Sequence, residues 1–324
     1  MSHGTVSHVL NHPERVRPEM RARVEAAIAD LGFIRDEAAR HLRAGYSTTI
    51  GVMLLDAWNP SFIDVARGVE AQTTDGPWTI LMSNSARDTK REQRYLREYA
   101  ERRVAGLIVV PNDRVSEEAH ALPHGDIPMV VVDRAEHGPG TMSVAVDDLL
   151  GGSLVADHLA GLGHRKIAFV GDTETARPVL DRFIGFQQRL AEICRDVELE
   201  VIRAPLTAEA GLDVGRELVS RGQSRRPTAV AAAVDLLAFG VMQSLLSAGI
   251  RLPDDISLTG YDDTSFSSQL SVPMTSIARP HYRMGTTAAD MLLSMINGTP
   301  PTFPHVVLQP ELVVRASTGV PLKW

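Results

Sequence analysis

The chain has 324 residues, which is too many for one compact core and enough for two or three domains. Its 44% hydrophobic and 23% charged residues are ordinary for a globular protein. The sequence has no apolar run long enough to span a bilayer and no N-terminal signal for secretion. Its single cysteine, Cys194, excludes an intramolecular disulfide and a cysteine-based metal site. We therefore expect a cytoplasmic protein without a metal or cofactor.

The net charge of −7 is unevenly distributed. Residues 1–45 hold seven Arg, no Lys, six acidic residues and four His, for a net charge of +1, which leaves −8 for the remainder. A mildly basic, His-rich head on an acidic body fits a small nucleic-acid-binding module. A solvated helical arm fits this distribution nearly as well.

The first eleven residues predict an amphipathic helix. Val6, Val9 and Leu10 have the i, i+3, i+4 spacing of one helical stripe. Short polar side chains that can bond to phosphates or base edges occupy the other face, namely His3, Thr5, Ser7, His8 and Asn11. Taken alone, this pattern also fits an ordinary surface helix.

The head continues with helical signals only. Pro18 and Glu19 suit the first turn of a helix, an apolar stripe runs from Val24 to Leu31, and Gly32 ends the pattern. A third short helix is predicted at 36–42, with Asp36 as its cap.

From residue 48 the pattern changes to alternating strands and helices. Continuous apolar runs predict buried parallel strands at 48–55, 78–82, 106–110 and 128–132, and helical stretches separate them at 61–74, 88–103 and 116–122. A second series begins near Ser143 with the strand SVAVD. Its further strands are predicted at 166–170, 200–203, 228–234 and 256–260, and its helices at 148–162, 180–195, 208–221 and 236–248. A helix at 283–296 and a strand pair, HVVLQ and ELVVR, close the chain. The series predicts an α/β fold with two doubly wound parallel sheets.

Two such halves imply a cleft between the carboxyl ends of their strands, where small molecules bind in open parallel sheets. The residues at those ends are polar, charged or aromatic: Asp56, Asn59, Phe62, Ser83, Asn84, Asp133, Arg134, Asp235, Tyr261, Asp262 and Asp263. They suit a polar or polyhydroxylated ligand. For any single acidic residue among them, capping of the next helix is an equally good explanation.

The order of motifs along the whole chain resembles the lactose-repressor (LacI/GalR) family of bacterial transcription factors. The motifs are TVSHVLN, NHPERVRPEMRARVEAAIADLGF, AARHLRAG, IGVMLLDAWNPSF, ERRVAGLIVV, VVDR, HLAGLGHRKIAFVG, DRFIGF, DLLAFGVMQSLLSAGIRLPDDISLTGYDD and LQPELVVRAS.

The resemblance implies a helix-turn-helix head over 1–46 with a hinge helix at 36–43, and a periplasmic-binding-protein-like sensor over 47–324. We expect an N-subdomain at about 47–142 and 276–303 and a C-subdomain at about 143–275 and 304–324. The family also implies a homodimer that reads a near-palindromic operator.

The resemblance assigns DNA-binding roles by position. His3, Gly4 and His8 match base-reading residues, and Thr5, Ser7 and Asn11 match residues that hold the DNA backbone. In the hinge helix, Arg40 is placed with the DNA-binding residues, and Leu42 matches a leucine that wedges into the minor groove. Apart from the resemblance, Leu42 would be an ordinary apolar helix residue. His8 replaces a common Arg, so we expect an unusual operator half-site.

In the sensor, Arg182 of DRFIGF matches an effector-gripping arginine, and Asp262 of GYDD matches a hydroxyl-binding carboxylate. The remaining residues expected to bind the effector lie in effector-lining segments or at strand ends: Asp56, Asn59, Phe62, Asp133, Asp235 and Arg279. Val234 stands in place of a usual Asn, Leu206 in place of a frequent aromatic residue, and Arg279 where many relatives have Gln. Two arginines suggest the hypothesis of an effector that carries a carboxylate or phosphate.

These features predict a DNA-binding transcriptional repressor that a small polar effector switches, with a sugar or sugar derivative as the expected effector. A solute-binding protein of an uptake system and a sensor-only paralogue without DNA binding are the alternatives. The sequence lacks GxGxxG after a strand, a P-loop, GxSxG and HExxH, so we do not expect an enzyme. The effector, the operator, the direction of the switch and a dimer versus a tetramer remain open at this point.

In the family, about fourteen residues that include a first helix precede the position that Met1 holds here. We therefore expect that the natural start lies upstream. If the chain begins at Met1, the stripe of Val6, Val9 and Leu10 lacks its partner helix, and the head should be frayed and bind DNA poorly. An in-frame stop within the preceding fifteen or so codons would exclude the upstream start.

Overall fold

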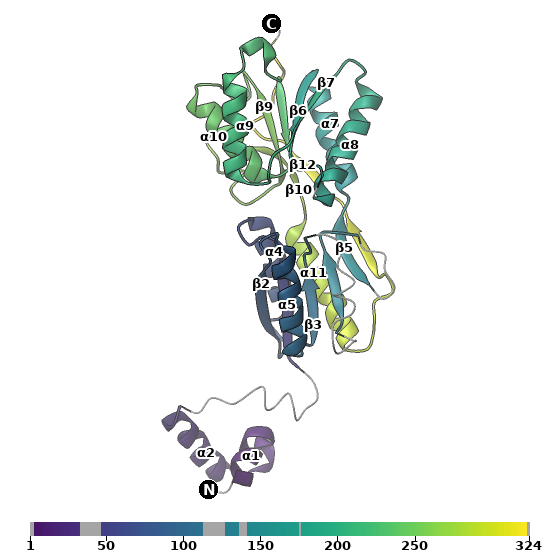
Figure 1. Cartoon of the computed structure of the whole chain (residues 1–324). Helices are drawn as coiled ribbons and strands as arrows, with labels where there is room; N and C mark the ends of the chain where they lie inside the picture. Colours follow the sequence, from purple (N-terminus) through teal and green to yellow (C-terminus); the bar gives the residue numbers. More distant parts are fainter. Residues whose placement is uncertain (1–2, 33–46, 113–126, 136–140, 175, 323–324) are drawn as a thin grey trace. The chain divides into compact units, whose positions relative to one another are not determined.

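The computed structural model describes residues 3–32, 47–112, 127–135, 141–174 and 176–322. Contacts between residues divide the chain into a head, Met1–Ser47, and a core, Thr48–Trp324. We describe each unit by itself (Figure 1).

The head is helical, as the sequence predicted. It contains α1 (His3–Asn11), a 3-10 helix η1 (Pro13–Arg15) and α2 (Pro18–Asp30). Among the head residues whose burial is described, Val9 of α1 and Val24 of α2 are the buried apolar side chains, with exposed fractions of 5% and 1%. Leu31, at the end of the predicted stripe, is instead 81% exposed, because α2 has already ended and Gly32 turns the chain at a φ of +57°. The predicted helix at 36–42 lies outside the described residues.

The first lobe of the core is built on a parallel sheet with strand order β11-β5-β4-β3-β1-β2. Its strands are β1 (Thr49–Leu54), β2 (Thr79–Asn84), β3 (Gly106–Val109), β4 (Met129–Val132), β5 (Met142–Val146) and β11 (His305–Leu308). Side chains alternate between the two faces of a strand. Ile50, Val52 and Leu54 therefore pack with α4 (Pro60–Thr73) and α11 (His281–Ile296), while Met53 packs on the other face with α5 (Thr89–Glu101).

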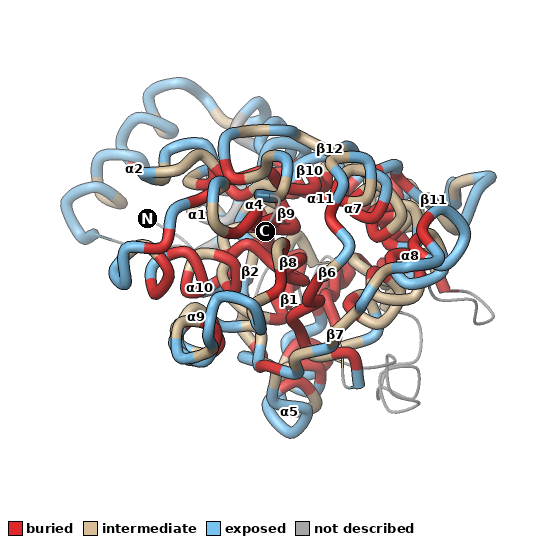
Figure 2. Tube along the Cα trace, turned by 90° about the horizontal axis from the view of Figure 1, so that it is seen from above, coloured by how far each residue is buried: buried red, intermediate tan, exposed pale blue. Residues whose placement is uncertain are grey.

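The second lobe has strand order β12-β10-β9-β8-β6-β7, and its only antiparallel pair among the described residues is β10 with β12. Its strands are β6 (Lys166–Val170), β7 (Glu198–Ile202), β8 (Ala229–Ala232), β9 (Ser257–Asp262), β10 (Thr275–Ala278) and β12 (Glu311–Val313). The helix pair α7 (Asp148–Gly161) and α8 (Arg177–Ile193) packs on one face, and the pair α9 (Ala208–Ser220) and α10 (Asp235–Ser247) on the other. A short 3-10 helix, η2 (Gln223–Arg225), follows α9. The inner strands β6, β8, β9 and β10 are buried between helices whose outer faces are exposed (Figure 2), whereas the edge strands β7 and β12 are partly exposed.

The doubly wound α/β fold is confirmed, but three strands differ from their predicted places. The strand at 142–146 does not open the second series, because β5 pairs with β4 and β11 in the first sheet. HVVLQ and ELVVR are not partners: β11 and β12 lie in different sheets. The sequence analysis did not predict β10, which joins the second sheet.

These strand positions correct the predicted subdomain boundaries at 143, 276 and 304. The chain passes between the lobes three times: after β5, between β10 and α11, and between β11 and β12. Residues 143–146 and 305–308 therefore belong to the first lobe, and residues 276–278 to the second. Apolar periodicity could not show this, because both sheets are built from similar buried runs.

None of the helices in the described part of the chain has the length and hydropathy that a bilayer crossing requires.

Candidate functional site

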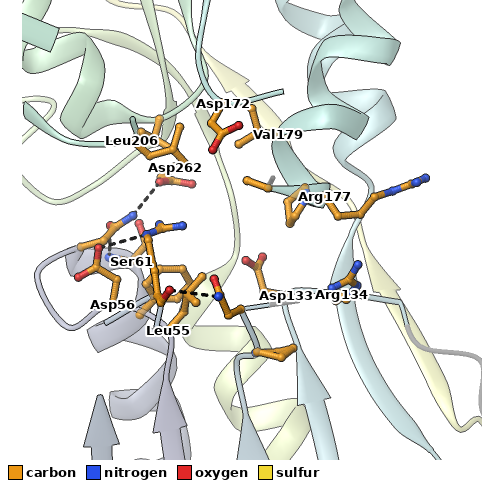
Figure 3. Close-up of a pocket in the computed structure, with 18 of the residues that line it drawn as sticks. Leu55, Asp56, Ser61, Asp133, Arg134, Asp172, Arg177, Val179, Leu206 and Asp262 are labelled. Carbon is orange, nitrogen blue, oxygen red and sulfur yellow. Dashed lines mark hydrogen bonds and ion pairs between the residues drawn. The ribbon is translucent and has the colours of Figure 1, made fainter. Parts of the chain in front are cut away.

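The carboxyl ends of strands from both lobes border a cavity of about 960 Å³. The first lobe contributes Asp56, Asn59, Phe62 and Asp133, and the second contributes Asp172, Arg182, Leu206 and Asp262. Arg279 lies on the segment that crosses from β10 to α11. Figure 3 shows the labelled side chains of the two lobes on opposite sides of this cavity. We call it the main cleft.

Two buried arginines and three aspartates form the charged centre of the main cleft, which we call the Arg–Asp cluster: Asp133, Asp148, Arg182, Asp262 and Arg279. The Arg182 Nε donates to Asp148 Oδ1 at 3.0 Å, and its Nη1 donates to the Ala233 carbonyl at 2.7 Å. The Arg279 Nη2 donates to the Asp133 carboxylate. Further ion pairs join Arg279 to Asp148 at 3.6 Å and to Asp262 at 3.6 Å, and Arg182 to Asp262 at 3.8 Å.

Burial and charge act in opposite directions on these groups. Burial alone lowers the pKa of Arg279, but Asp133, Asp148 and Asp262 together raise it well above its usual value. Burial raises the pKa of Asp262, and the two arginines oppose that shift. The guanidinium of Arg182 also lies over the Tyr261 ring, 3.9 Å from its centroid. Both arginines therefore stay charged and paired.

Asn59 and Asp56 hold the first lobe's edge of the cleft. The Asn59 side chain caps α4 by accepting from the Ser61 N–H at 3.0 Å, and its Nδ2 donates to Asp262 of the other lobe at 3.3 Å. Asp56 accepts from the Trp58 N–H at 3.0 Å and lies 3.5 Å from Arg87. Trp58 is 85% exposed at this edge.

Backbone strain accompanies the cluster. Asp133 and Asp262 have φ angles of 72° and 113°, where non-glycine residues are uncommon. Each such residue costs about 1 kcal/mol or more and is usually retained where it aims a side chain. Here both side chains are aimed at Arg279.

Asp235 does not line the main cleft. It is fully buried at the start of α10 and accepts from the Thr264 N–H at 2.7 Å and from the hydroxyls of Thr264, Ser267 and Ser276 at 2.9, 2.6 and 2.7 Å. Burial and then the neighbouring Asp262 raise its pKa to about 6, although these hydrogen bonds favour the charged form. Asp235 thus holds the loop after β9, which begins next to Asp262.

Seven of the eight residues that the sequence analysis expected to bind an effector line the main cleft: Asp56, Asn59, Phe62, Asp133, Arg182, Asp262 and Arg279. Val234 and Leu206 line it as well. The sequence analysis missed Asp148 of the cluster and Trp58 at the edge. The sequence offered a signal for each: Asp148 belongs to an acidic pair at the start of α7, and Trp58 is an aromatic residue soon after β1.

The expectation of an anionic effector loses its basis in this geometry. That expectation was based on the added positive charge of Arg279, but three aspartates with side chains no more than 10% exposed form ion pairs with its guanidinium. The main cleft is therefore not an uncompensated cationic site.

The residues expected to bind DNA lie mostly on α1. Gly4 and His8 are exposed on this helix, Thr5 is half-buried, and the His8 Nδ1 donates to the Gly4 carbonyl at 3.2 Å. His3, Ser7 and Asn11 belong to the same helix. Arg40 and Leu42, with the expected hinge helix, lie outside the described residues.

Two family models match the chain. The model described as "Bacterial regulatory proteins, lacI family" matches residues 1–36, and the "Periplasmic binding protein-like domain" matches residues 156–318. The "HTH-type transcriptional repressor PurR" of Aliivibrio fischeri (strain MJ11) is 31% identical over 316 residues, which are 97% of this chain and 94% of that protein.

Solved structures agree with these matches. A LacI family transcriptional regulator from Enterococcus faecium with bound ribose has 30% identity and a TM-score of 0.76, and covers 85% of this chain and 100% of its own. A regulator from Silicibacter pomeroyi shares the fold at 23% identity, with a TM-score of 0.85. The match covers 98% of this chain and 96% of that protein.

Proposed function

Because the chain belongs to the lacI family of bacterial regulatory proteins, we propose that it is a transcriptional repressor switched by a small neutral sugar. As a homodimer in the cytoplasm, it binds a near-palindromic operator through α1, and its affinity for the operator changes when an effector occupies the main cleft. The Arg–Asp cluster between the two lobes is the observation that carries this proposal. The same arrangement supports a binding function rather than an enzymatic one.

The chemistry of the main cleft suits neighbouring hydroxyl groups. A sugar hydroxyl donates one hydrogen bond and accepts others, and the cluster presents carboxylate acceptors beside guanidinium donors. Phe62 and Trp58 add apolar surface for the C–H face of a ring. The paired charges favour a neutral ligand, and the bound ribose in the Enterococcus faecium relative supports this class.

The switch follows from the three chain crossings between the lobes. Arg279 lies on one crossing and contacts Asp133 of the first lobe and Asp262 of the second. A ligand that binds these groups more tightly in one lobe arrangement shifts the lobes toward it. Coupling between effector and DNA of about 1–3 kcal/mol is the usual size for such a switch.

The DNA-binding part is tested by fluorescence anisotropy, with the full chain titrated into duplex fragments from its own upstream region. Specific binding that weakens steeply between about 50 and 200 mM salt supports the proposal, because phosphate contacts release counterions. Thr5→Ala and His8→Ala should weaken it, whereas Arg94→Ala on α5 should not. Fragments bound no better than random DNA would favour the sensor-only alternative.

The effector part is tested separately by thermal shift with neutral pentoses and hexoses. Stabilisation by a neutral sugar that Asp262→Asn abolishes is the expected result. The same sugar must then change the anisotropy titration. Sugar binding without any DNA binding would favour a sensor-only or solute-binding protein, and turnover of a sugar would overturn the assignment of a non-enzyme.

A further inference from the structure

A second cavity, of about 320 Å³, lies where α4 and α11 begin. Three buried residues, Ser61, Asp262 and Arg279, line both this cavity and the main cleft, and so form a partition between them. The other lining residues belong to the first turns of the two helices and to the loop after β9: Asp64, Asp263, Thr264, Pro280, His281, Tyr282 and Arg283.

The two helices run parallel and present their N-termini to the second cavity. A Cβ at Gly68 would lie 2.1 Å from the Tyr282 carbonyl, and one at Gly285 would lie 2.0 Å from the Val65 carbonyl. Further along, Gln72 donates to Asp290. Parallel N-termini add their positive partial charges, which attract anions. No side chain caps α11. The His281 N–H already donates to the Arg279 carbonyl and the Met284 N–H to the Pro280 carbonyl, both at 2.8 Å, which leaves the N–H groups of Tyr282 and Arg283 as the first-turn donors that this helix offers within the described part of the chain.

Two buried polar atoms in the partition have no partner. Ser61 Oγ and Arg279 Nε make no hydrogen bond within the described part of the chain, although their residues are only 3% and 6% exposed. Buried donors are rarely left unbonded in folded proteins, and an exception points to an ion, a water molecule or a ligand. Arg283 adds an exposed cation that forms no ion pair with the described residues.

The carboxylates of the second cavity are already neutralised. Arg67 Nη1 lies 2.8 Å from Asp64, Arg315 binds Asp263 with two nitrogens at 2.6 and 3.1 Å, and Asp262 belongs to the Arg–Asp cluster. Burial and the two cluster arginines lower the pKa of His281 well below its usual value, so it adds no charge at neutral pH. Among the charged residues that line the second cavity, Arg283 is the one that forms no ion pair with the described part of the chain.

We propose that the second cavity binds a phosphate group, either as free phosphate or carried by a small metabolite. Arg283 and the N-termini of α4 and α11 supply the attraction, and Ser61 Oγ and Arg279 Nε supply donors from the partition. This site goes beyond the proposed function, since it needs neither DNA nor a sugar. An occupant would contact three residues that also line the main cleft.

Isothermal titration calorimetry of the full chain with inorganic phosphate, at constant ionic strength, tests the proposal. We expect saturable binding, and Arg283→Ala should lower the affinity for phosphate about tenfold or more because it removes one charge-assisted contact. Arg97→Ala, which removes an exposed arginine from α5, is the matched control and should bind as the parent does. Circular dichroism verifies that both variants fold.

A third variant separates the two cavities. Arg177 lines only the main cleft, so Arg177→Ala should leave phosphate binding unchanged. Tighter binding of glycerol 3-phosphate than of phosphate would identify a metabolite as the source, and equal binding would identify free phosphate. No saturable heat, equal binding by Arg283→Ala, or a loss confined to Arg177→Ala would each overturn the proposal.

Discussion

Arg279→Met removes the central cation of the Arg–Asp cluster while keeping most of its volume. The Arg279 side chain is 2% exposed, and those of Asp133, Asp148 and Asp262 are 10%, 7% and 3% exposed. Asp148 and Asp262 retain Arg182 at 3.0 and 3.8 Å, but Asp133 pairs with no other cation in the described chain. Breaking a buried pair on one side costs about 3–5 kcal/mol.

Urea unfolding followed by circular dichroism at pH 7 measures this free energy. The control, Arg221→Met, removes a cation whose two partners, Glu200 and Glu217, have side chains that are 41% and 54% exposed, and should cost about 1 kcal/mol or less. Adding Asp133→Asn to Arg279→Met should recover part of the loss, because the unpaired carboxylate is removed. Equal costs for the two single variants, or no recovery in the double variant, would refute the role assigned to the cluster.

Two further predictions concern packing and pH. Gly152→Ala in α7 places a Cβ 1.9 Å from the Arg182 carbonyl and should lower the free energy of unfolding by about 1–3 kcal/mol. Its control, Gly161→Ala in the same helix, places a Cβ that meets nothing within 4 Å and should leave this free energy unchanged. Similar urea midpoints for the two variants would contradict the prediction. His164 is buried among Thr228, Ser257 and Gly319, and burial lowers its pKa from 6.5 to about 4. Because His164 binds a proton more readily in the unfolded chain than in the folded one, its neutral form stabilises the fold. This stabilisation is complete above pH 6.5 and is lost as the pH falls toward 4. Between pH 7 and 5 the free energy of unfolding of the parent should fall by about 2 kcal/mol more than that of His164→Gln. Parallel plots of this free energy against pH for the two proteins would contradict the prediction.

Local signals in the sequence were sufficient for most elements. Apolar runs such as the one that becomes β1, and helix limits such as Pro18 and Gly32, act between neighbours along the chain. The helices and strands they predicted within the described residues are present, with ends displaced by a few residues. The head, the alternation of strands and helices and the bilobed class followed from these signals and from the resemblance to known regulators.

The assignment of strands to sheets could not be read in this way. The strand β5 pairs with β11 through residues such as Ser143 and His305, which are 162 positions apart. Such pairing depends on which backbone edges meet after folding, and similar buried runs fit either sheet. The short strand β10 carries the chain to Arg279 and had no long apolar run to reveal it.

The sequence by itself determined where the main cleft lies, because the carboxyl ends of parallel strands collect the residues that follow them. Five of the seven expected residues that line the cleft follow such strands, namely Asp56, Asn59, Phe62, Asp133 and Asp262, whereas Arg182 and Arg279 were expected from the family resemblance. Only the tertiary structure decided the electrostatics. Arg279 reads as an added cation along the chain, but folding places Asp133, Asp148 and Asp262 around it from three separate segments. Charges are compensated through space, and the partners of a buried charge are set by packing rather than by neighbours in sequence.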